Sequence, residues 1–390
     1  MYAYDSRKVA KGDVFLCLPG GDAYKEEALK RGAREILIVS RKEMAQLANQ
    51  FYDFPSNKLK VIGVTGTNGK SSVCHFVTQA LKELGENAFI QGTLSHNLTT
   101  PESLDTFSNM HQHLMMGGTY FVMEVSSHGI AQQRIAEINF DVKCLTNISQ
   151  DHLDFHKTME AYRQVKYDFM DELACQKIFP HDFQNVELEF DNLDVPDFEI
   201  LNKKAALAIL LACGFDYKKS VEALTSLAPP KGRFEVISSH APFSVVVDYA
   251  HSPNGVEVVL NEARKQVQKR GGSVLVCYGC GGDRDRKKRP LMAEMVSNLA
   301  DYSIITMDNP RTEEPEQIVN DMVTGIDSKH HYEVILDRKK AIETLCLKAK
   351  DNDLVLVIGK GHESYQIIGE TSFPFSDSEI LKAVLTDLGY

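Results

Sequence analysis

The stretch VIGVTGTNGKSSV, residues 61–73, decides the fold of this 390-residue chain. Val61–Val64 is apolar and reads as a buried strand, and Ser71 begins an amphipathic pattern that predicts a helix to about Leu84. A glycine-rich turn joins the two. A strand, such a turn and a helix in this order are typical of a phosphate-binding loop in a parallel α/β sheet.

The turn carries the groups that phosphate binding needs. Glycines let backbone N–H groups converge on phosphate oxygens, and the helix N-terminus adds partial positive charge. We expect Lys70 to neutralise the β- and γ-phosphates and the Ser71 hydroxyl to ligate Mg²⁺. The spacing differs from the strict GxxxxGK[ST] pattern, because Val64 stands at the usual first glycine. The predicted nucleotide-binding residues of the turn are Gly66, Thr67, Asn68, Gly69, Lys70, Ser71 and Ser72.

The rest of the chain alternates short β-rich runs with helical stretches, which predicts an α/β fold with mainly parallel sheets. Helices are expected at Glu43–Tyr52 and Asn202–Ala212. Two segments interrupt the pattern and are candidate boundaries, Phe54–Asn57 and the proline-containing Ala228–Gly232. The other predicted strands are Val14–Leu18, Glu35–Val39, Tyr120–Val125, Val142–Asn147, Ser244–Val247, Val274–Cys277, Ser303–Thr306, Glu333–Leu336 and Leu354–Ile358.

Composition narrows the class of protein. With 43% hydrophobic and 25% charged residues, the chain has the mixture of a globular protein. The net charge of −11 leaves no global basic field for nucleic acid or an anionic membrane. The chain shows no apolar run of signal-peptide or membrane-spanning length, and its eight cysteines are scattered. We therefore expect a cytoplasmic protein with reduced thiols, no membrane insertion and no nucleic-acid partner.

Acidic and histidine residues follow two of the predicted strands. Glu124 ends an apolar strand, where a carboxylate can reach a metal at the edge of the sheet. Asp151 and His152 lie in the segment NISQDHLDFH after the next strand. They could form an independent zinc site, but sharing the magnesium–nucleotide with Ser71 and Glu124 is the more economical interpretation. His111 and His113 are predicted to lie in a solvated loop. At this point kinase, GTPase and ligase chemistry all stay open.

Further motifs make the chain resemble the ATP-dependent Mur ligases of peptidoglycan assembly. TGTNGKSS, EVSSHG, NISQDHLDFH, GRFE and VDYAHSPN begin at residues 65, 124, 147, 232 and 247, in the family's order. CGGDRD at 280–285, DNPR at 308–311 and GKGHE at 359–363 are similar to motifs of the branch that adds meso-diaminopimelate. The resemblance implies three domains: a shortened UDP-sugar-binding domain (1–58), a central ATP-binding domain (59–229) and a Rossmann-like ligase domain for the incoming amino acid (230–390).

The resemblance also implies a reaction. ATP would phosphorylate a carboxylate of UDP-MurNAc-L-Ala-D-Glu, and the amine of meso-diaminopimelate would then displace phosphate from the acyl phosphate. Both steps gather negative charge, so an electrostatic clamp is expected. The implied catalytic residues are Lys70, Glu124, His152 and Lys166 of a monomeric enzyme. A sister ligase that adds L-lysine or uses another carboxylate acceptor, and a nucleotide-binding protein without ligase activity, are the alternatives.

Other roles are carried over from the family position by position. Lys166 matches a carbamylated lysine, whereas the residue pattern alone predicts a solvated lysine on a helix. The implied ligands of magnesium are Ser71, Glu124, His152 and carbamylated Lys166. Further nucleotide contacts would be Asn202, Arg233 and Asp248. The muramoyl dipeptide would be held by Ser6, Thr99, Thr100, Ser126, Gln132 and Arg134.

The resemblance places the incoming amino acid at the C-terminal motifs. Arg311 would bind its distal carboxylate through a guanidinium fork, and Glu363 would hold the distal ammonium. The alternative is that Arg311 is a surface residue beside Glu313 and Glu314. The residues implied for this pocket are Arg284, Asp308, Asn309, Pro310, Arg311, Gly359 and Glu363.

Overall fold

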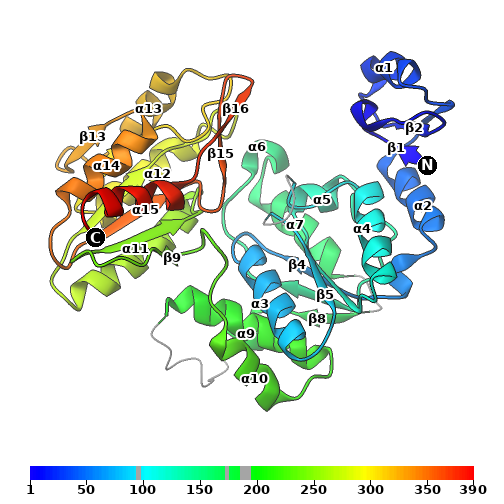
Figure 1. The fold of residues 1–390 in the computed structure, drawn as a ribbon, viewed down its shortest axis with the longest axis horizontal. Helices are drawn as coiled ribbons and strands as arrows, with labels where there is room; N and C mark the ends of the chain where they lie inside the picture. The colour runs from blue at the N-terminus through cyan, green and yellow to red at the C-terminus, as the bar shows by residue number, and fades with distance from the viewer. Residues whose placement is uncertain (94–97, 172–174, 185–194) are drawn as a thin grey trace. The chain divides into compact units, whose positions relative to one another are not determined.

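The computed structural model describes residues 1–93, 98–171, 175–184 and 195–390 (Figure 1). The chain divides into two compact units, and each is described by itself. The first unit contains the described residues of 1–148, 160–194 and 199–227. The second unit contains 149–159, 195–198 and 228–390.

A five-stranded parallel sheet forms the centre of the first unit, with the strand order β5-β6-β4-β7-β8. Val64 of β4 pairs with Glu124 of β6 on one side and with Cys144 of β7 on the other. The carboxyl ends of these three strands therefore meet at one edge of the sheet. The strands span Lys60–Thr65 (β4), Ala88–Gln91 (β5), Tyr120–Glu124 (β6), Val142–Leu145 (β7) and Gln176–Ile178 (β8).

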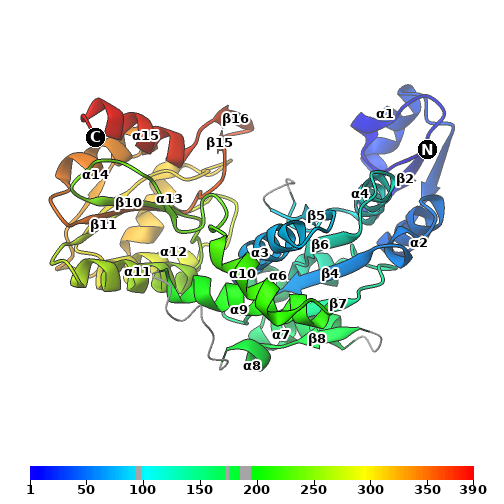
Figure 2. The ribbon, with the colours of Figure 1, turned by 60° about the horizontal axis from the view of Figure 1, so that its bottom comes forward.

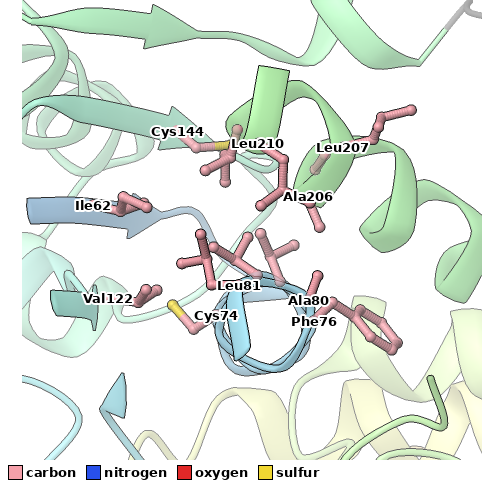
Figure 3. Close-up of a cluster of buried hydrophobic side chains, with 14 of the residues drawn as sticks. Ile62, Cys74, Phe76, Ala80, Leu81, Val122, Cys144, Ala206, Leu207 and Leu210 are labelled. Atoms are coloured by element: carbon pink, nitrogen blue, oxygen red, sulfur yellow. The ribbon is translucent and has the colours of Figure 1, made fainter. Parts of the chain in front are cut away.

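Both faces of this sheet are covered, because alternate residues along each strand point to opposite sides. One face packs on α3 (Lys70–Glu83), α9 (Asp197–Ala212) and α10 (Tyr217–Ser226). Figure 3 shows this core, in which side chains from α3 and α9 lie against Ile62, Val122 and Cys144 of three adjacent strands. The other face, with Val61, Phe121 and Met123, packs with α2 (Arg41–Phe51) and α4 (Ser103–Met115).

A small parallel sheet precedes the central one, with β1 (Tyr2–Ala3), β2 (Val14–Cys17) and β3 (Glu35–Ile38) in that order. Phe15 and Cys17 face a minor core with Ala28 of α1 (Lys25–Lys30). Val14 and Leu16 point the other way, into the core that also covers β4 and β6. The N-terminal segment therefore shares a core with the central sheet. The domain boundary after residue 58 stays a prediction.

The second unit contains a doubly wound sheet with the strand order β13-β12-β11-β14-β10-β9, parallel except for β9. Figure 2 shows helices on both sides of β10 and β11. Helices α11 (Pro253–Gln268), α12 (Lys288–Leu299) and α13 (Pro315–Val323) cover one face, and α14 (Arg338–Lys348) and α15 (Asp377–Asp387) cover the other. A hairpin, β15 (Tyr365–Ile368) and β16 (Thr371–Pro374), follows β14. The sheet strands are Glu235–Val236 (β9), Ser244–Asp248 (β10), Val274–Tyr278 (β11), Tyr302–Ile305 (β12), Tyr332–Val334 (β13) and Leu354–Ile358 (β14).

The predicted strands and helices are confirmed, with ends that differ by a few residues, and the sheets are mainly parallel as expected. The prediction for His111 and His113 was wrong, since both lie on α4. The side chain of His113 is buried, and its Nε2 lies 3.0 Å from the carbonyl oxygens of Asn87 and Tyr120. In the part of the chain that the structure describes, no helix is long and apolar enough to cross a membrane.

One ion pair in the second unit is fully buried. Arg338, at the start of α14, donates from Nη2 to Asp377 Oδ2 (2.7 Å) and from Nε to Oδ1 (2.8 Å), and both side chains have 0% exposure. Nη2 also donates to the carbonyl of Ile358 at the end of β14 (2.9 Å). The pair thus ties α14 and α15 to the central strand of the sheet.

We expect Arg338→Met to lower the free energy of unfolding by about 3–5 kcal/mol, because Asp377 would be left buried without its partner. Urea denaturation followed by far-UV circular dichroism measures this change. Lys382→Met, which removes an exposed pair with Glu379 on α15, is the matched control and should unfold like the unmodified protein. Equal stability of the two variants would contradict the structural role of the buried pair.

Candidate active site

The phosphate loop between β4 and α3 is closely packed by neighbouring side chains. Gly66 and Gly69 have φ values of 146° and 85°, which side-chain-bearing residues rarely adopt. A Cβ on Gly66 would collide with Thr146 Oγ1, and a Cβ on Gly69 would lie 2.5 Å from Asn202 Oδ1. Both glycines are therefore required, and the Asn202 side chain of α9 lies directly over the loop.

The end of β7 holds the loop in place. The Thr67 N–H donates to the carbonyl of Asn147 (2.9 Å), and the Asn68 N–H donates to Asn147 Oδ1 (3.0 Å). Thr146 Oγ1 donates to the carbonyl of Asn68 (2.6 Å). These bonds fix the backbone of the loop before any ligand arrives, which is the preorganisation that phosphate binding requires.

Two lysines converge on the carbonyl oxygen of Gly66. Lys70 Nζ donates to it at 3.0 Å and to the carbonyl of Thr67 at 2.9 Å. Lys166, on α7 (Met159–Met170), donates to the same Gly66 oxygen at 2.9 Å. Lys166 is only 1% exposed. The prediction of a solvated lysine, which the residue pattern alone suggested, was wrong.

Glu124 lies beside Ser71 in the first turn of α3. Its Oε2 accepts a hydrogen bond from Ser71 Oγ (2.9 Å), and its Oε1 accepts one from the backbone N–H of Thr93 (2.8 Å). A Cβ on Gly92 would collide with the carboxylate. A hydroxyl and a carboxylate at the mouth of a phosphate loop are the hard oxygen donors that Mg²⁺ prefers, so this chain's residues fit that ion.

A second polar cluster is hydrogen-bonded to the backbone of Glu124. Thr100 Oγ1 lies 3.0 Å from both the carbonyl oxygen of Glu124 and Ser126 Oγ. Arg134 Nη1 donates to the carbonyl of Thr100 (2.9 Å), and its Nε lies 3.4 Å from Glu102 Oε1. Burial lowers the pKa of Arg134. A desolvated guanidinium near the carboxylate of Glu124 is suited to an anionic ligand.

The remaining residues predicted for the dipeptide lie in the same unit. Thr99 Oγ1 is 3.1 Å from Thr93 Oγ1. Gln132 Oε1 is buried and has no hydrogen-bond partner among the described residues. Ser6 lies in the N-terminal sheet region, is buried and donates to Glu27 Oε2 (2.6 Å).

Three of the residues predicted for the nucleotide and the metal belong to the second unit. Asp248 is buried at the end of β10 and accepts from the N–H groups of Phe234 (2.7 Å) and Ala250 (2.6 Å). Burial raises its pKa. The guanidinium of Arg233 lies 4.5 Å from the ring centroid of Tyr249. His152 precedes α6 (Leu153–His156), and its Nε2 is 3.5 Å from Asp151 Oδ2.

The structure does not gather all the predicted ligands of magnesium into one unit, since His152 lies in the second unit and Ser71, Glu124 and Lys166 in the first. Among the described residues, no group of three or more His, Cys, Asp and Glu side chains could hold a metal ion. A magnesium site in the first unit would therefore draw on Ser71, Glu124 and phosphate oxygens.

The C-terminal motifs come together in the second unit. Arg311 has a φ of 52° and donates from Nη1 to the carbonyl of Gly282 (2.8 Å). Burial and the nearby Arg284 lower the pKa of Arg311. A Cβ on Gly281 would lie 2.9 Å from Arg311 Nη1 and 3.6 Å from Arg284 Cγ, so the two arginines flank this glycine. The Arg311 side chain is half-buried, which favours a binding role over the alternative of a plain surface arginine, and that role stays a prediction.

The carboxylates of Asp308 and Glu363 also lie among these C-terminal motifs. Glu363 Oε2 accepts from Asn309 Nδ2 (2.9 Å). A Cβ on Gly359, whose φ is 113°, would lie 2.8 Å from Asp308 Oδ2, so glycine is needed there. The carbonyl of Pro310 closes over Gly282, where a Cβ would collide with it. The second unit thus offers cations and anions within one cluster.

Comparison with known proteins decides the family. Residues 64–236 match the Mur ligase middle domain, and residues 232–361 match the Mur ligase glutamate ligase domain. The chain belongs to the Mur ligase family. Its relatives include UDP-N-acetylmuramoyl-L-alanyl-D-glutamate–2,6-diaminopimelate ligases of Clostridioides difficile, 35% identical over 99% of this chain and 94% of the relative, and of Aquifex aeolicus, 34% identical over 98% and 92%.

Solved structures of Mur ligases share the fold. A UDP-N-acetylmuramoyl-L-alanyl-D-glutamate–2,6-diaminopimelate ligase has a TM-score of 0.60 at 28% identity, covering 100% of this chain and 95% of that one. A MurF ligase from Thermotoga maritima in complex with ADP has a TM-score of 0.66 at 18% identity, covering 99% and 97%. The alignment with the C. difficile relative spans 460 positions, so this Mur ligase of 390 residues lacks segments that the relative has.

Sequence reasoning missed several residues of the candidate site. Glu102 bridges Arg134 to Arg41 of α2, whose Nε lies 3.0 Å from Glu102 Oε1. Thr146 and Asn147 hold the loop from the end of β7, a position that the strand prediction could have flagged. Lys360 lies inside the GKGHE motif and contacts Glu363, but nothing in the pattern distinguishes it from a solvated lysine.

Proposed function

We propose that this Mur ligase uses ATP to join 2,6-diaminopimelate to UDP-N-acetylmuramoyl-L-alanyl-D-glutamate, with release of ADP and phosphate. Relatives with this named activity are 34–35% identical over nearly the whole chain. The observation that carries the proposal is the phosphate loop, with Glu124 bonded to Ser71 and Arg134 joined to Glu124 through Thr100. A place for nucleotide phosphates thus adjoins a cation suited to a substrate carboxylate.

The division of labour along the chain is part of the proposal. Residues 1–58 would bind the UDP-sugar, 59–229 would bind ATP, and 230–390 would bind the incoming amino acid. The separate sheets of the two units and the domain matches at 64–236 and 232–361 support it. We further propose a cytoplasmic monomer, in keeping with the scattered cysteines of the sequence.

In the first step, a substrate carboxylate attacks the γ-phosphorus of ATP and ADP leaves, which produces an acyl phosphate. Lys70 and the loop N–H groups other than those that donate to Asn147 would bind the phosphates, and Asn202, Arg233 and Asp248 would contact the nucleoside. Mg²⁺ bound at Ser71 and Glu124 would supply positive charge against the phosphate oxygens. The dipeptide would be held by Arg134 with Ser6, Thr99, Thr100, Ser126 and Gln132.

In the second step, the amine of the acceptor attacks the acyl carbon, the amide bond forms, and inorganic phosphate leaves as the amine loses a proton. Positioning of the amine is the task of the second unit. Arg311 and Arg284 would take the distal carboxylate, and Glu363 would take the distal ammonium. Asp308, Asn309, Pro310 and Gly359 shape the same pocket.

A carbamylated Lys166 is also part of the proposal. Burial disfavours an ammonium, and so does the second cation, Lys70, on the same Gly66 oxygen. A neutral amine can add to CO₂ and lose a proton, giving a carbamate anion. Carbamylation would thus turn Lys166 from a second cation beside Lys70 into an anion that can bind a metal as a carboxylate does.

The alternative acceptor is L-lysine, and Arg311 argues against it. Its guanidinium is half-buried and its pKa is lowered by burial, so a ligand without a distal carboxylate would leave the charge desolvated and unpaired. The same reasoning applies to any acceptor that ends in an amine alone.

The function is tested by phosphate release with UDP-muramoyl-dipeptide and each candidate amine. We expect diaminopimelate to exceed lysine in kcat/KM by about a hundredfold or more, because only it pairs with Arg311. Arg311→Ala should lose this preference while its affinity for ATP stays unchanged. Equal kcat/KM for the two amines in the unmodified enzyme would refute the assignment, and activity only with another acceptor would point to a sister ligase.

Lys70→Ala should weaken binding of magnesium–ATP by about 2–5 kcal/mol, since a charged partner is lost from a partly buried phosphate site. Isothermal titration calorimetry measures this affinity directly. Lys82→Ala, on the exposed side of the same helix α3, is the control and should bind as the unmodified protein does. Unchanged affinity in Lys70→Ala would rule out the phosphate-loop assignment.

Lys166→Ala should nearly abolish ligation with the fold intact, because the proposed carbamate is lost. In the unmodified enzyme, turnover should fall in buffer freed of CO₂ and return when bicarbonate is added, and the variant should show no such response. Arg163→Ala, an exposed neighbour on α7, controls for changes in the helix. Normal turnover of Lys166→Ala would show that the carbamate plays no part.

A further inference from the structure

Lys360 is a completely buried lysine that none of the steps above uses. Its side chain has 0% exposure, and its Nζ donates to Glu363 Oε2 (2.8 Å) and to Asn309 Oδ1 (3.0 Å). Nζ also lies 5.7 Å from the ring centroid of Tyr365. Burying an ammonium is costly unless its hydrogen bonds are made inside the protein. The hydrogen bonds of Lys360 to Glu363 and Asn309 therefore indicate what this lysine does in the pocket.

The first consequence concerns the side-chain amide of Asn309. Its Oδ1 accepts from Lys360 Nζ and from the backbone N–H of Ile367 (2.9 Å), and its Nδ2 donates to Glu363 Oε2 (2.9 Å). A flipped amide would place the NH₂ group against two donors, so Lys360 selects one orientation. Asn309 is 2% exposed, so bulk solvent has little access to its amide.

The second consequence concerns the carboxylate of Glu363. Its Oε2 accepts from both Lys360 and Asn309. The carboxylate is thereby held in one orientation by a charge-assisted bond and a neutral one. Among the described residues Oε1 makes no such bond, and it is the oxygen that a substrate ammonium can meet.

The third consequence reaches the β15–β16 hairpin and Arg311. The backbone N–H of Arg311 donates to the carbonyl of Ile367 (3.2 Å), and the N–H of Gly369 donates to the carbonyl of Arg311 (2.8 Å). These bonds hold Arg311 at its positive φ of 52°, an uncommon backbone conformation for a residue with a side chain. Because Ile367 also bonds Asn309, Lys360 is linked through one amide to the strand that holds Arg311.

We propose that Lys360 is a positioning residue of the amino-acid pocket. It orients the Glu363 carboxylate directly and, through Asn309 and Ile367, the strand that fixes Arg311. An anion and a cation held in this way match an acceptor that carries both an ammonium and a carboxylate at its far end. The inference rests on the proposed function. It adds that Lys360 sets the spacing between the charges of Glu363 and Arg311.

Lys360→Met removes the charge and keeps an unbranched side chain of similar length. We expect the KM for diaminopimelate to rise about tenfold or more, the scale seen when a group that orients a binding residue is lost. The KM values for ATP and UDP-muramoyl-dipeptide should stay as in the unmodified enzyme, and the preference over lysine should shrink. Lys382→Met on α15 serves as the control for removing a lysine elsewhere in the unit.

Two results would overturn the proposal. One is an unchanged KM for diaminopimelate in Lys360→Met. The other is a parallel rise of all three KM values with a lower Tm, which would mark a merely structural lysine. If Lys360→Met does not fold, the double variant with Glu363→Gln, which removes both charges of the ion pair, is compared with Glu363→Gln alone. Equal KM values for diaminopimelate support action through Glu363, and a further rise contradicts it.

The same experiment separates this inference from the proposed function. An unmodified enzyme that releases no phosphate with diaminopimelate would refute the function itself. An unmodified enzyme that does so, beside a Lys360→Met variant with the same KM, would refute only the positioning role.

Discussion

The meeting of three parallel strands at one sheet edge is the constraint on which the first unit depends. Val64 pairs with both Glu124 and Cys144, so the chain leaves β4, β6 and β7 at the same level. The phosphate loop directly follows β4, the Thr146–Asn147 segment directly follows β7, and Glu124 is the last residue of β6. Their proximity follows from strand pairing alone, and the glycines at 66 and 69 are needed because the space above the edge is already filled.

Much of this could be predicted from local pattern. The apolar strand, the glycine-rich turn and the amphipathic helix follow one another directly in the sequence, so a short window is enough to predict them. Parallel pairing of the strands then predicts that Glu124 lies near Ser71. The same reasoning gave the α/β class, because the strands alternate with helices. The resemblance to Mur ligases added the C-terminal motifs, whose clustering in the second unit no local pattern indicates.

The residues that sequence reasoning misread are those whose surroundings come from distant segments. Lys166 lies on a helix with ordinary polar neighbours, and only the packing of α7 against the loop buries it. His113 was assigned to a solvated loop because nothing near it in the sequence indicated a partner, and its two carbonyl partners, Asn87 and Tyr120, lie in other segments of the chain. Glu102 and Lys360 are similar cases. A charge becomes distinctive only when the fold removes its water, and that depends on tertiary contacts.

The shared core of the two sheets in the first unit limits how this protein could lose its beginning. Met44 and Ala48 of α2 are fully buried in the core that also covers β4 and β6. A chain trimmed to start at the central sheet would present that apolar face to water, an aggregation hazard. Whatever ligand it holds, the N-terminal segment therefore also shields an apolar face of the central sheet from water.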